Sequence, residues 1–137
     1  MRIAVVFFCV ICLYATGASA MHGGLGRFGT DRVPQPVLIS PVKDTADITG
    51  KDSLEFKWSS HESANGFRKY YDFRLYAGTN WVQSALIYKE QVDSQQYMKS
   101  LPANMFENGK TYTWTLRQVY DVSRKSDRSY NTFKVIK

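Results

Sequence analysis

The chain has 137 residues, a formal net charge of +6 and a hydrophobic content of 44%. This length is typical of one domain, and aromatic residues at 15% of the chain supply enough large apolar side chains for a core, which excludes a disordered tail. Because only two His and two Cys are present, the composition also excludes most multi-ligand metal sites and disulfide-based scaffolds.

The first 20 residues have the three parts of a secretory signal peptide. Arg2 provides the positive charge, residues 3–14 form an uncharged and mostly apolar stretch, and the segment from Ala18 to Ala20 has the small-x-small pattern of a cleavage site. A stretch of about a dozen residues is short for a bilayer core roughly 30 Å thick, so we expect cleavage after Ala20. The prediction is a secreted or periplasmic protein that keeps no membrane span after cleavage.

The segment after the signal peptide, residues 21–33, is rich in glycine and poor in core-forming side chains. This composition predicts a flexible N-terminal segment. Both cysteines, Cys9 and Cys12, lie inside the signal peptide. The exported domain is therefore expected to have no disulfide and to depend on its hydrophobic core for stability.

From residue 34 onward, short extended runs alternate with turn signals. Large apolar side chains recur at every second position around Trp58, Phe73, Trp114 and Phe133, and this alternation is typical of strands with one buried face. No segment has the 3.6-residue periodicity of a long amphipathic helix. About seven short strands with regular turn spacing predict an all-β protein built as a β-sandwich.

The order and spacing of these runs resemble the fibronectin type III family, in the variant common in bacterial secreted proteins. The segments that carry the resemblance are residues 34–41 (PQPVLISP), the aromatic strand ending at Trp58, residues 71–75 (YDFRL), a corner containing Leu101, residues 108–114 (NGKTYTW) and residues 133–135 (FKV). The resemblance implies a seven-stranded antiparallel immunoglobulin-like β-sandwich over residues 34–137. It also implies that the strands around residues 71–75, 112–116 and 133–135 are neighbours in one sheet.

Large side chains at the inward positions are expected to form the core. The resemblance implies that Trp58 packs against Tyr112 and its neighbours, and that the Tyr112 hydroxyl hydrogen-bonds upstream backbone as a tyrosine corner. Replacing Trp58 by Ala is expected to cost about 3–5 kcal/mol, which a melting curve would detect. The expected core residues are Trp58, Tyr71, Phe73, Leu75, Leu101, Tyr112, Trp114, Leu116 and Phe133.

The sequence gives little support for catalysis. His61 is the one histidine of the predicted domain and lies in a polar loop, where neighbouring residues rarely converge into a Ser–His–carboxylate site. Carboxylates such as Asp44 and Asp47 lie in turns, without the regular spacing of a calcium loop. No glycine-rich phosphate loop follows a strand and opens a helix. We expect a non-enzymatic protein without a metal or a cofactor.

The outward positions of the same strands are the main candidates for binding. They combine aromatic, basic and apolar side chains, and Tyr and Arg are enriched at binding hot spots. The alternative is an ordinary solvated sheet face whose cross-strand pairs serve stability alone. The candidate binding residues on this face are Tyr70, Arg74, Tyr76, Arg117 and Lys134.

Two loops add further candidates. Trp81 lies beside amide side chains and either stacks on a sugar ring or a partner, or folds back to cap one end of the sandwich. The basic run at residues 124–128 either meets an anionic surface polymer or forms a solvated turn. The sequence leaves both alternatives open.

Two functions fit these features. The first is an exported binding or structural module that docks on an envelope or extracellular protein, or on a second copy of itself, because the family mostly serves as spacer and docking unit. The alternative is a carbohydrate-binding module that uses Trp81 and outward tyrosines. Nucleic acid is not an expected partner, because the positive charge is modest and the domain is exported.

Overall fold

The structure is a computed structural model that describes residues 32–61 and 66–137. The predicted signal peptide and the predicted flexible segment up to residue 31 lie outside the described residues. Packed contacts begin slightly before the predicted domain start, since Val33 is buried and Arg32 pairs with Asp127. In the described part of the chain, no helix has the length and apolar composition that a membrane span requires.

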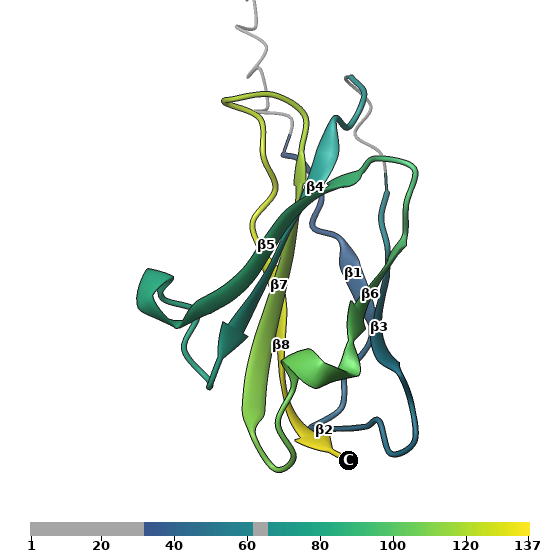
Figure 1. Cartoon of the computed structure of the whole chain (residues 1–137). Helices are drawn as coiled ribbons and strands as arrows, with labels where there is room; N and C mark the ends of the chain where they lie inside the picture. The colour runs from purple at the N-terminus through teal and green to yellow at the C-terminus, as the bar shows by residue number, and fades with distance from the viewer. Residues whose placement is uncertain (1–31, 62–65) are drawn as a thin grey trace, which may run out of the picture.

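The described residues form two β-sheets that face one another (Figure 1). One sheet has the strand order β1-β3-β6, and the other has the order β2-β8-β7-β4-β5. Two short 3-10 turns, η1 (Gln83–Ala85) and η2 (Ala103–Met105), complete the secondary structure. The strands are β1 (Val37–Ser40), β2 (Thr45–Asp47), β3 (Ser53–Ser59), β4 (Tyr70–Ala77), β5 (Leu86–Asp93), β6 (Met98–Pro102), β7 (Thr111–Val119) and β8 (Ser129–Ile136).

The number of strands and one pairing differ from the prediction of seven antiparallel strands. The described residues contain eight strands, because a short strand that the sequence did not predict, β2, follows the turn at Pro41. A proline has no N–H to continue a hydrogen-bonded ladder. Before Pro41, β1 pairs antiparallel with β3, whereas beyond it β2 lies parallel to β8 in the other sheet. The N-terminal run therefore borders both sheets.

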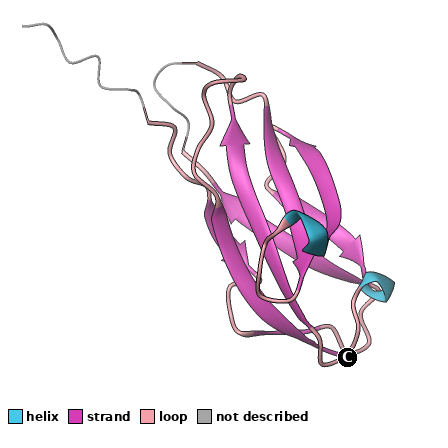
Figure 2. Cartoon of the chain, turned by 90° about the vertical axis from the view of Figure 1, so that its left-hand side faces the viewer, coloured by secondary structure: helices cyan, strands magenta, loops and turns pink. Residues whose placement is uncertain are grey.

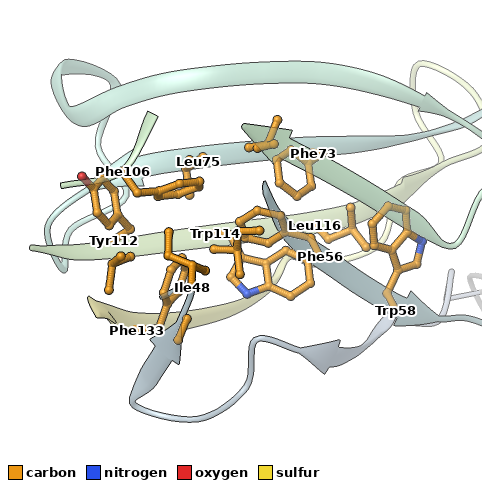
Figure 3. Packing of buried hydrophobic residues seen from close by; sticks show 14 of the residues in the cluster. Ile48, Phe56, Trp58, Phe73, Leu75, Phe106, Tyr112, Trp114, Leu116 and Phe133 are labelled. Carbon is orange, nitrogen blue, oxygen red and sulfur yellow. The ribbon is translucent and has the colours of Figure 1, made fainter. Parts of the chain in front are cut away.

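The core between the sheets is built largely from aromatic rings (Figure 3). Phe56 on β3 lies at its centre, with its ring centroid 5.1 Å from that of Phe73, 5.2 Å from that of Trp114 and 6.0 Å from that of Phe133. Edge-to-face and tilted arrangements of this kind are favourable for aromatic rings. All the side chains expected in the core are buried: Trp58, Tyr71, Phe73, Leu75, Leu101, Tyr112, Trp114, Leu116 and Phe133.

The expected packing of Trp58 against Tyr112 is wrong, because the two rings lie at opposite ends of the core (Figure 3). Trp58 packs edge-on against Tyr71, with ring centroids 5.3 Å apart, whereas Tyr112 packs against Phe106 at 5.2 Å. Phe56 and Trp114 pack against each other between them (Figure 3). Trp58 and Tyr112 each lie two residues from this pair, in opposite directions along the core, and each residue advances a strand by about 3.3 Å. The Tyr112 hydroxyl accepts a hydrogen bond of 2.9 Å from the Glu107 N–H, which is the upstream-backbone contact that the resemblance implied.

Candidate binding surface

The candidate site lies on the outer face of the five-stranded sheet, which Figure 2 shows from in front. Residues directly opposite one another in neighbouring strands point to the same face. Arg74 on β4 lies between Lys89 on β5 and Thr115 on β7, and Thr115 lies opposite Tyr130 on β8. This row of four side chains crosses four strands. The sheet therefore gathers residues that are far apart in the sequence.

The neighbouring row is centred on Asp72, whose side chain is only 6% exposed. Arg74 on the same strand donates from Nε and Nη2 to the two carboxylate oxygens, at 3.1 Å each. Arg117, opposite Asp72 on β7, donates to Oδ2 from Nε at 3.2 Å, and its Nη2 lies 3.1 Å from the same oxygen in an ion pair. Arg128 also donates to Oδ2, and its Nη1 donates to Thr115 Oγ1 at 3.0 Å. Asp72, Arg74, Arg117 and Arg128 are called the Asp72 cluster below.

The Asp72 cluster combines three guanidiniums with one carboxylate. Burial raises the pKa of the Asp72 carboxyl, but the hydrogen bond from Arg74 and the charge of Arg128 lower it by more, so the net pKa lies below the ordinary value. Asp72 is therefore ionised at neutral pH. Its single negative charge cannot balance three positive ones, and the cluster keeps a formal excess of positive charge.

The pKa values of Arg74 and Arg128 respond to this imbalance in opposite directions. Burial lowers the pKa of Arg74, but its hydrogen bonds to Asp72 and Tyr76 raise it by more. Burial lowers the pKa of Arg128, the charge of Asp72 raises it, and the charges of Arg117 and Arg74 lower it again, so the net pKa lies below the ordinary value. The side chain of Arg128 is 9% exposed, against 21% for Arg74 and 27% for Arg117. Arg128 holds the cluster together, whereas Arg74 and Arg117 reach solvent.

The β4–β5 connection, residues 78–85, folds over the part of the outer face next to the Asp72 cluster, where Figure 2 shows η1 in front of the sheet. The Thr113 hydroxyl donates to the Gly78 carbonyl at 2.8 Å, and Gly78 has a positive φ of 81° that favours glycine. Trp81 stacks on Tyr130 with ring centroids 5.6 Å apart and an interplanar angle of 25°. Trp81 therefore folds back onto the sheet face and not onto an end of the sandwich.

The Trp81–Tyr130 pair is called the aromatic shelf below. Trp81 remains 43% exposed and Tyr130 60% exposed, so stacking holds both rings in place without removing them from solvent. Tyr130 shares its cross-strand row with Arg74. The aromatic shelf and the Asp72 cluster thus form one continuous surface.

The structure places the other candidate residues less favourably. Tyr76 is on the outer face but only 3% exposed, because it lies opposite Thr113, where the β4–β5 connection covers the sheet. It is unavailable to a partner, which corrects its selection as a binding residue. Tyr70 is half-buried at the other end of β4. Lys134 is exposed but lies opposite Thr111, toward the far end of β8.

The basic run at residues 124–128 is not one continuous solvated patch. Asp127 pairs with Arg32 across 3.3 Å, and Arg124 lies over the Tyr120 ring at 5.4 Å. Arg128 turns into the Asp72 cluster. The run therefore serves mainly to attach the β7–β8 connection to the domain, and its last residue contributes to the outer face.

Asp72, Tyr130 and Lys89 belong to the surface but were not selected from the sequence as binding residues, and Arg128 was considered there only as part of the basic run at residues 124–128. The sequence pattern could have indicated two of them, because the alternation that makes Thr132 an outward residue of β8 also makes Tyr130 and Arg128 outward residues. Lys89 follows from the same alternation in β5. The alternation cannot show that these side chains converge, because convergence depends on the register of four strands.

Other parts of the described surface are weaker candidates for a functional site. A hollow of about 540 Å³ lies beside the β2–β3 turn, but its charged lining residues Lys51, Asp52 and Glu55 are all exposed. Among the described residues, no group of three His, Cys, Asp or Glu side chains could hold a metal ion. His61 is exposed, and its carbonyl accepts a hydrogen bond of 3.2 Å from Gln118 Nε2. The absence of enzymatic activity stays a prediction.

No protein-family model and no curated protein sequence matches the chain. Among solved structures, it is similar to the "Twitchin kinase region from C. elegans (Fn31-NL-kin-CRD-Ig26)", with 12% sequence identity and a TM-score of 0.42. The match covers 72% of this chain and 15% of that one. At this TM-score the similarity carries no argument about function.

Proposed function

We propose that the protein is an exported, non-enzymatic binding module of the fibronectin type III type. It docks on a protein partner at the cell envelope or surface through the outer face of its five-stranded sheet. The observation that carries the proposal is the continuity of the Asp72 cluster with the aromatic shelf. Arginine, tyrosine and tryptophan are the residues most enriched where interfaces gain their energy.

The sheet order supports the fibronectin type III assignment. If β1 and β2 are counted as the two halves of one strand, the eight strands become the seven of an immunoglobulin-like sandwich. The strands β4, β7 and β8 are then neighbours in one sheet, as the resemblance implies. A fold of this kind hosts many functions, so the docking proposal rests on the outer face and not on the fold.

The outer face is suited to docking because its side chains are held in place before a partner arrives. Arg74 and Arg117 are anchored on Asp72, and Trp81 is anchored on Tyr130. Anchored side chains lose little conformational entropy on binding, and this reduces one of the main costs of association. Partial burial also strengthens their electrostatic interactions relative to those of fully solvated groups.

A second candidate function is carbohydrate binding, which the half-exposed Trp81 ring favours. A ring held flat on the sheet offers a surface for a sugar. This alternative predicts that the protein is retained on a polysaccharide and that Trp81→Ala abolishes retention while the fold survives. The protein-docking proposal predicts no such retention.

Cross-linking mass spectrometry on the mature protein in its secreted and envelope fractions tests the docking proposal. Lys89 lies on the outer face, and Lys57 lies on the opposite sheet, so the two amines distinguish the faces. We expect cross-links from Lys89 to a second protein, and their loss in a folded Arg117→Gln variant. Cross-links from Lys57 alone would place the partner elsewhere, and capture of no protein would favour the carbohydrate alternative.

A further inference from the structure

The outer face has more positive charge and more hydrogen-bond donors than its own residues can satisfy. Three guanidiniums carry about fifteen N–H donors, whereas one carboxylate offers about four acceptor sites. Arg128 directs further N–H groups to the Asp72 carbonyl at 3.2 Å and to Thr115 Oγ1. Arg74 and Arg117, which reach solvent, therefore keep donors that an external acceptor can use.

The charges around the cluster extend this imbalance. Lys89 is exposed next to Arg74, in the same cross-strand row. The neighbouring Glu90 points to the other side of the sheet, where its Oε2 pairs with Lys99 Nζ at 2.5 Å. Asp93, at the end of β5, lies opposite Tyr70 and one row beyond Asp72. The surface beside the aromatic shelf is therefore basic, and charge complementarity calls for an anionic occupant.

The apolar side of the surface indicates what kind of anion fits. Two exposed aliphatic side chains lie close to Trp81 in the chain: Val82, in the same connection, and Ile87, on β5. Aliphatic neighbours favour an apolar side chain over the hydroxyl groups of a sugar, which would lose hydrogen bonds to water there. Adjacent strands lie about 4.8 Å apart, so the Arg74 and Tyr130 positions are roughly 10 Å apart. A short stretch of polypeptide covers that span.

From these observations we infer that the partner presents an acidic polypeptide segment to the outer face, an inference that rests on the proposed docking function. Asp or Glu carboxylates of the segment accept hydrogen bonds from Arg74 and Arg117, in the geometry that guanidinium and carboxylate groups share. An apolar side chain of the segment packs on the aromatic shelf. Asp72 occupies part of the guanidinium donors in the free protein and so limits the affinity for other carboxylates.

The test measures binding of the mature protein to poly-L-glutamate and to a Glu-rich synthetic peptide that carries a single Leu, at about 0.15 M salt, where the Debye length is about 8 Å. We expect Arg117→Gln and Arg74→Gln to weaken binding about tenfold, as the loss of one charge-assisted hydrogen bond predicts. The matched control, Lys57→Gln, removes the same charge from the opposite sheet and should change affinity less than about twofold. Replacing the Leu of the peptide by Gly should weaken binding to the wild type but not to Trp81→Ala.

A variant with the opposite expected effect separates a binding role from a structural one. Asp72→Asn removes the competing carboxylate and should tighten poly-L-glutamate binding several-fold, whereas a purely structural cluster predicts unchanged or weaker binding. If Asp72→Asn does not fold, the Arg117→Gln and Lys57→Gln comparison decides the question. Equal losses in Arg117→Gln and Lys57→Gln would overturn the inference, since binding would then follow net charge alone.

Two further outcomes distinguish this inference from the proposed function. Binding of polygalacturonate without binding of either polypeptide would overturn the acidic-polypeptide inference in favour of a polyuronate. Absence of acidic-peptide binding together with Lys89 cross-links to a protein would leave the docking function standing and refute only the acidic chemistry. Absence of both acidic-peptide binding and Lys89 cross-links would refute the two proposals together.

Discussion

The domain contains two sites where arginine guanidiniums are buried, and their positive charge is stabilised differently at each site. Arg68, just before β4, is 5% exposed and donates to the Ser94 carbonyl at 2.7 and 3.2 Å and to Gln118 Oε1 at 2.8 Å. Its guanidinium also lies 4.4 Å from the centroid of the Tyr71 ring. Among residues 32–61 and 66–137, no carboxylate pairs with it. Neutral acceptors and an aromatic face stabilise this cation.

The Asp72 cluster has the opposite arrangement, with three guanidiniums on one carboxylate. A buried charge is tolerated only when its hydrogen bonds are satisfied. The Arg68 site meets this condition with dispersed acceptors and is closed to solvent. In the Asp72 cluster the protein satisfies only some of the guanidinium hydrogen-bond donors, and two of the arginines, Arg74 and Arg117, remain accessible to solvent. The comparison teaches that burial of an arginine does not reveal its role, whereas the balance of donors and acceptors around it does.

The largest expected effect is the loss of the carboxylate. Asp72→Ala should lower the free energy of unfolding by about 3–5 kcal/mol, because three guanidiniums would lose their common counter-charge. Urea denaturation followed by tryptophan fluorescence measures the change. Asp44→Ala, which removes an exposed carboxylate from a turn, is the control and should change stability little. A loss below about 1 kcal/mol for Asp72→Ala would show that water replaces the carboxylate easily.

Removal of the isolated arginine should have the next largest effect. Arg68→Ala is expected to cost about 2–4 kcal/mol, because the Ser94 carbonyl and Gln118 Oε1 would lose their donors inside the protein. Arg68→Lys keeps the charge but not the planar fork, and should recover only part of the loss. The same denaturation experiment measures both variants. Full recovery with lysine would show that charge, and not the hydrogen-bond geometry, matters at this site.

Acid should distinguish the two sites. The pKa of Asp72 is lowered from 3.8 in the folded state, so its contribution to stability is present above that value and is lost as pH falls through the folded-state pKa. The stability difference between the wild type and Asp72→Ala should therefore shrink below about pH 4. The difference between the wild type and Arg68→Ala should stay nearly constant there. If the stabilities of the wild type, Asp72→Ala and Arg68→Ala changed with pH in parallel, Asp72 would not contribute to stability as an ionised carboxylate.

The smallest expected effect on stability belongs to Arg117→Gln. Arg117 is partly exposed, and Arg74 and Arg128 would still hold Asp72, so a loss of at most about 1 kcal/mol is expected. The same variant is predicted to weaken acidic-peptide binding about tenfold. Thermal melting and binding measured on one preparation check both statements. A large loss of stability would move Arg117 from the binding surface to the structural group.

Much of the core was predictable because alternation is a local property. A strand exposes successive side chains on opposite faces, so Phe73 and Trp114 could be placed inward from their neighbours alone. The strand β2 was missed because Thr45–Asp47 is short and has one apolar residue, Ala46. Its pairing with β8 depends on where the chain goes after Pro41, and local pattern does not contain that information.

The candidate surface was predictable only in its composition. The outward positions of β4 and β7 follow from alternation and include Arg74 and Arg117. The burial of Tyr76 does not follow from alternation, because the β4–β5 connection that follows it folds back over this part of the sheet face. The stacking of Trp81 on Tyr130 joins two residues that the sequence separates widely. Loop conformation and sheet register, which depend on the whole domain, decide such contacts.

The sequence by itself determined most of the strand-forming segments, with β2 as the exception, together with the inward and outward residues of the main strands and the positive charge. These properties depend on spacing along the chain and on composition, and both are local or additive. Only the tertiary structure decided that Asp72 and Arg128 meet and that an aromatic shelf borders them. The physical reason is that hydrogen bonds and stacking act over a few ångströms. Their partners are therefore chosen by which strands become neighbours.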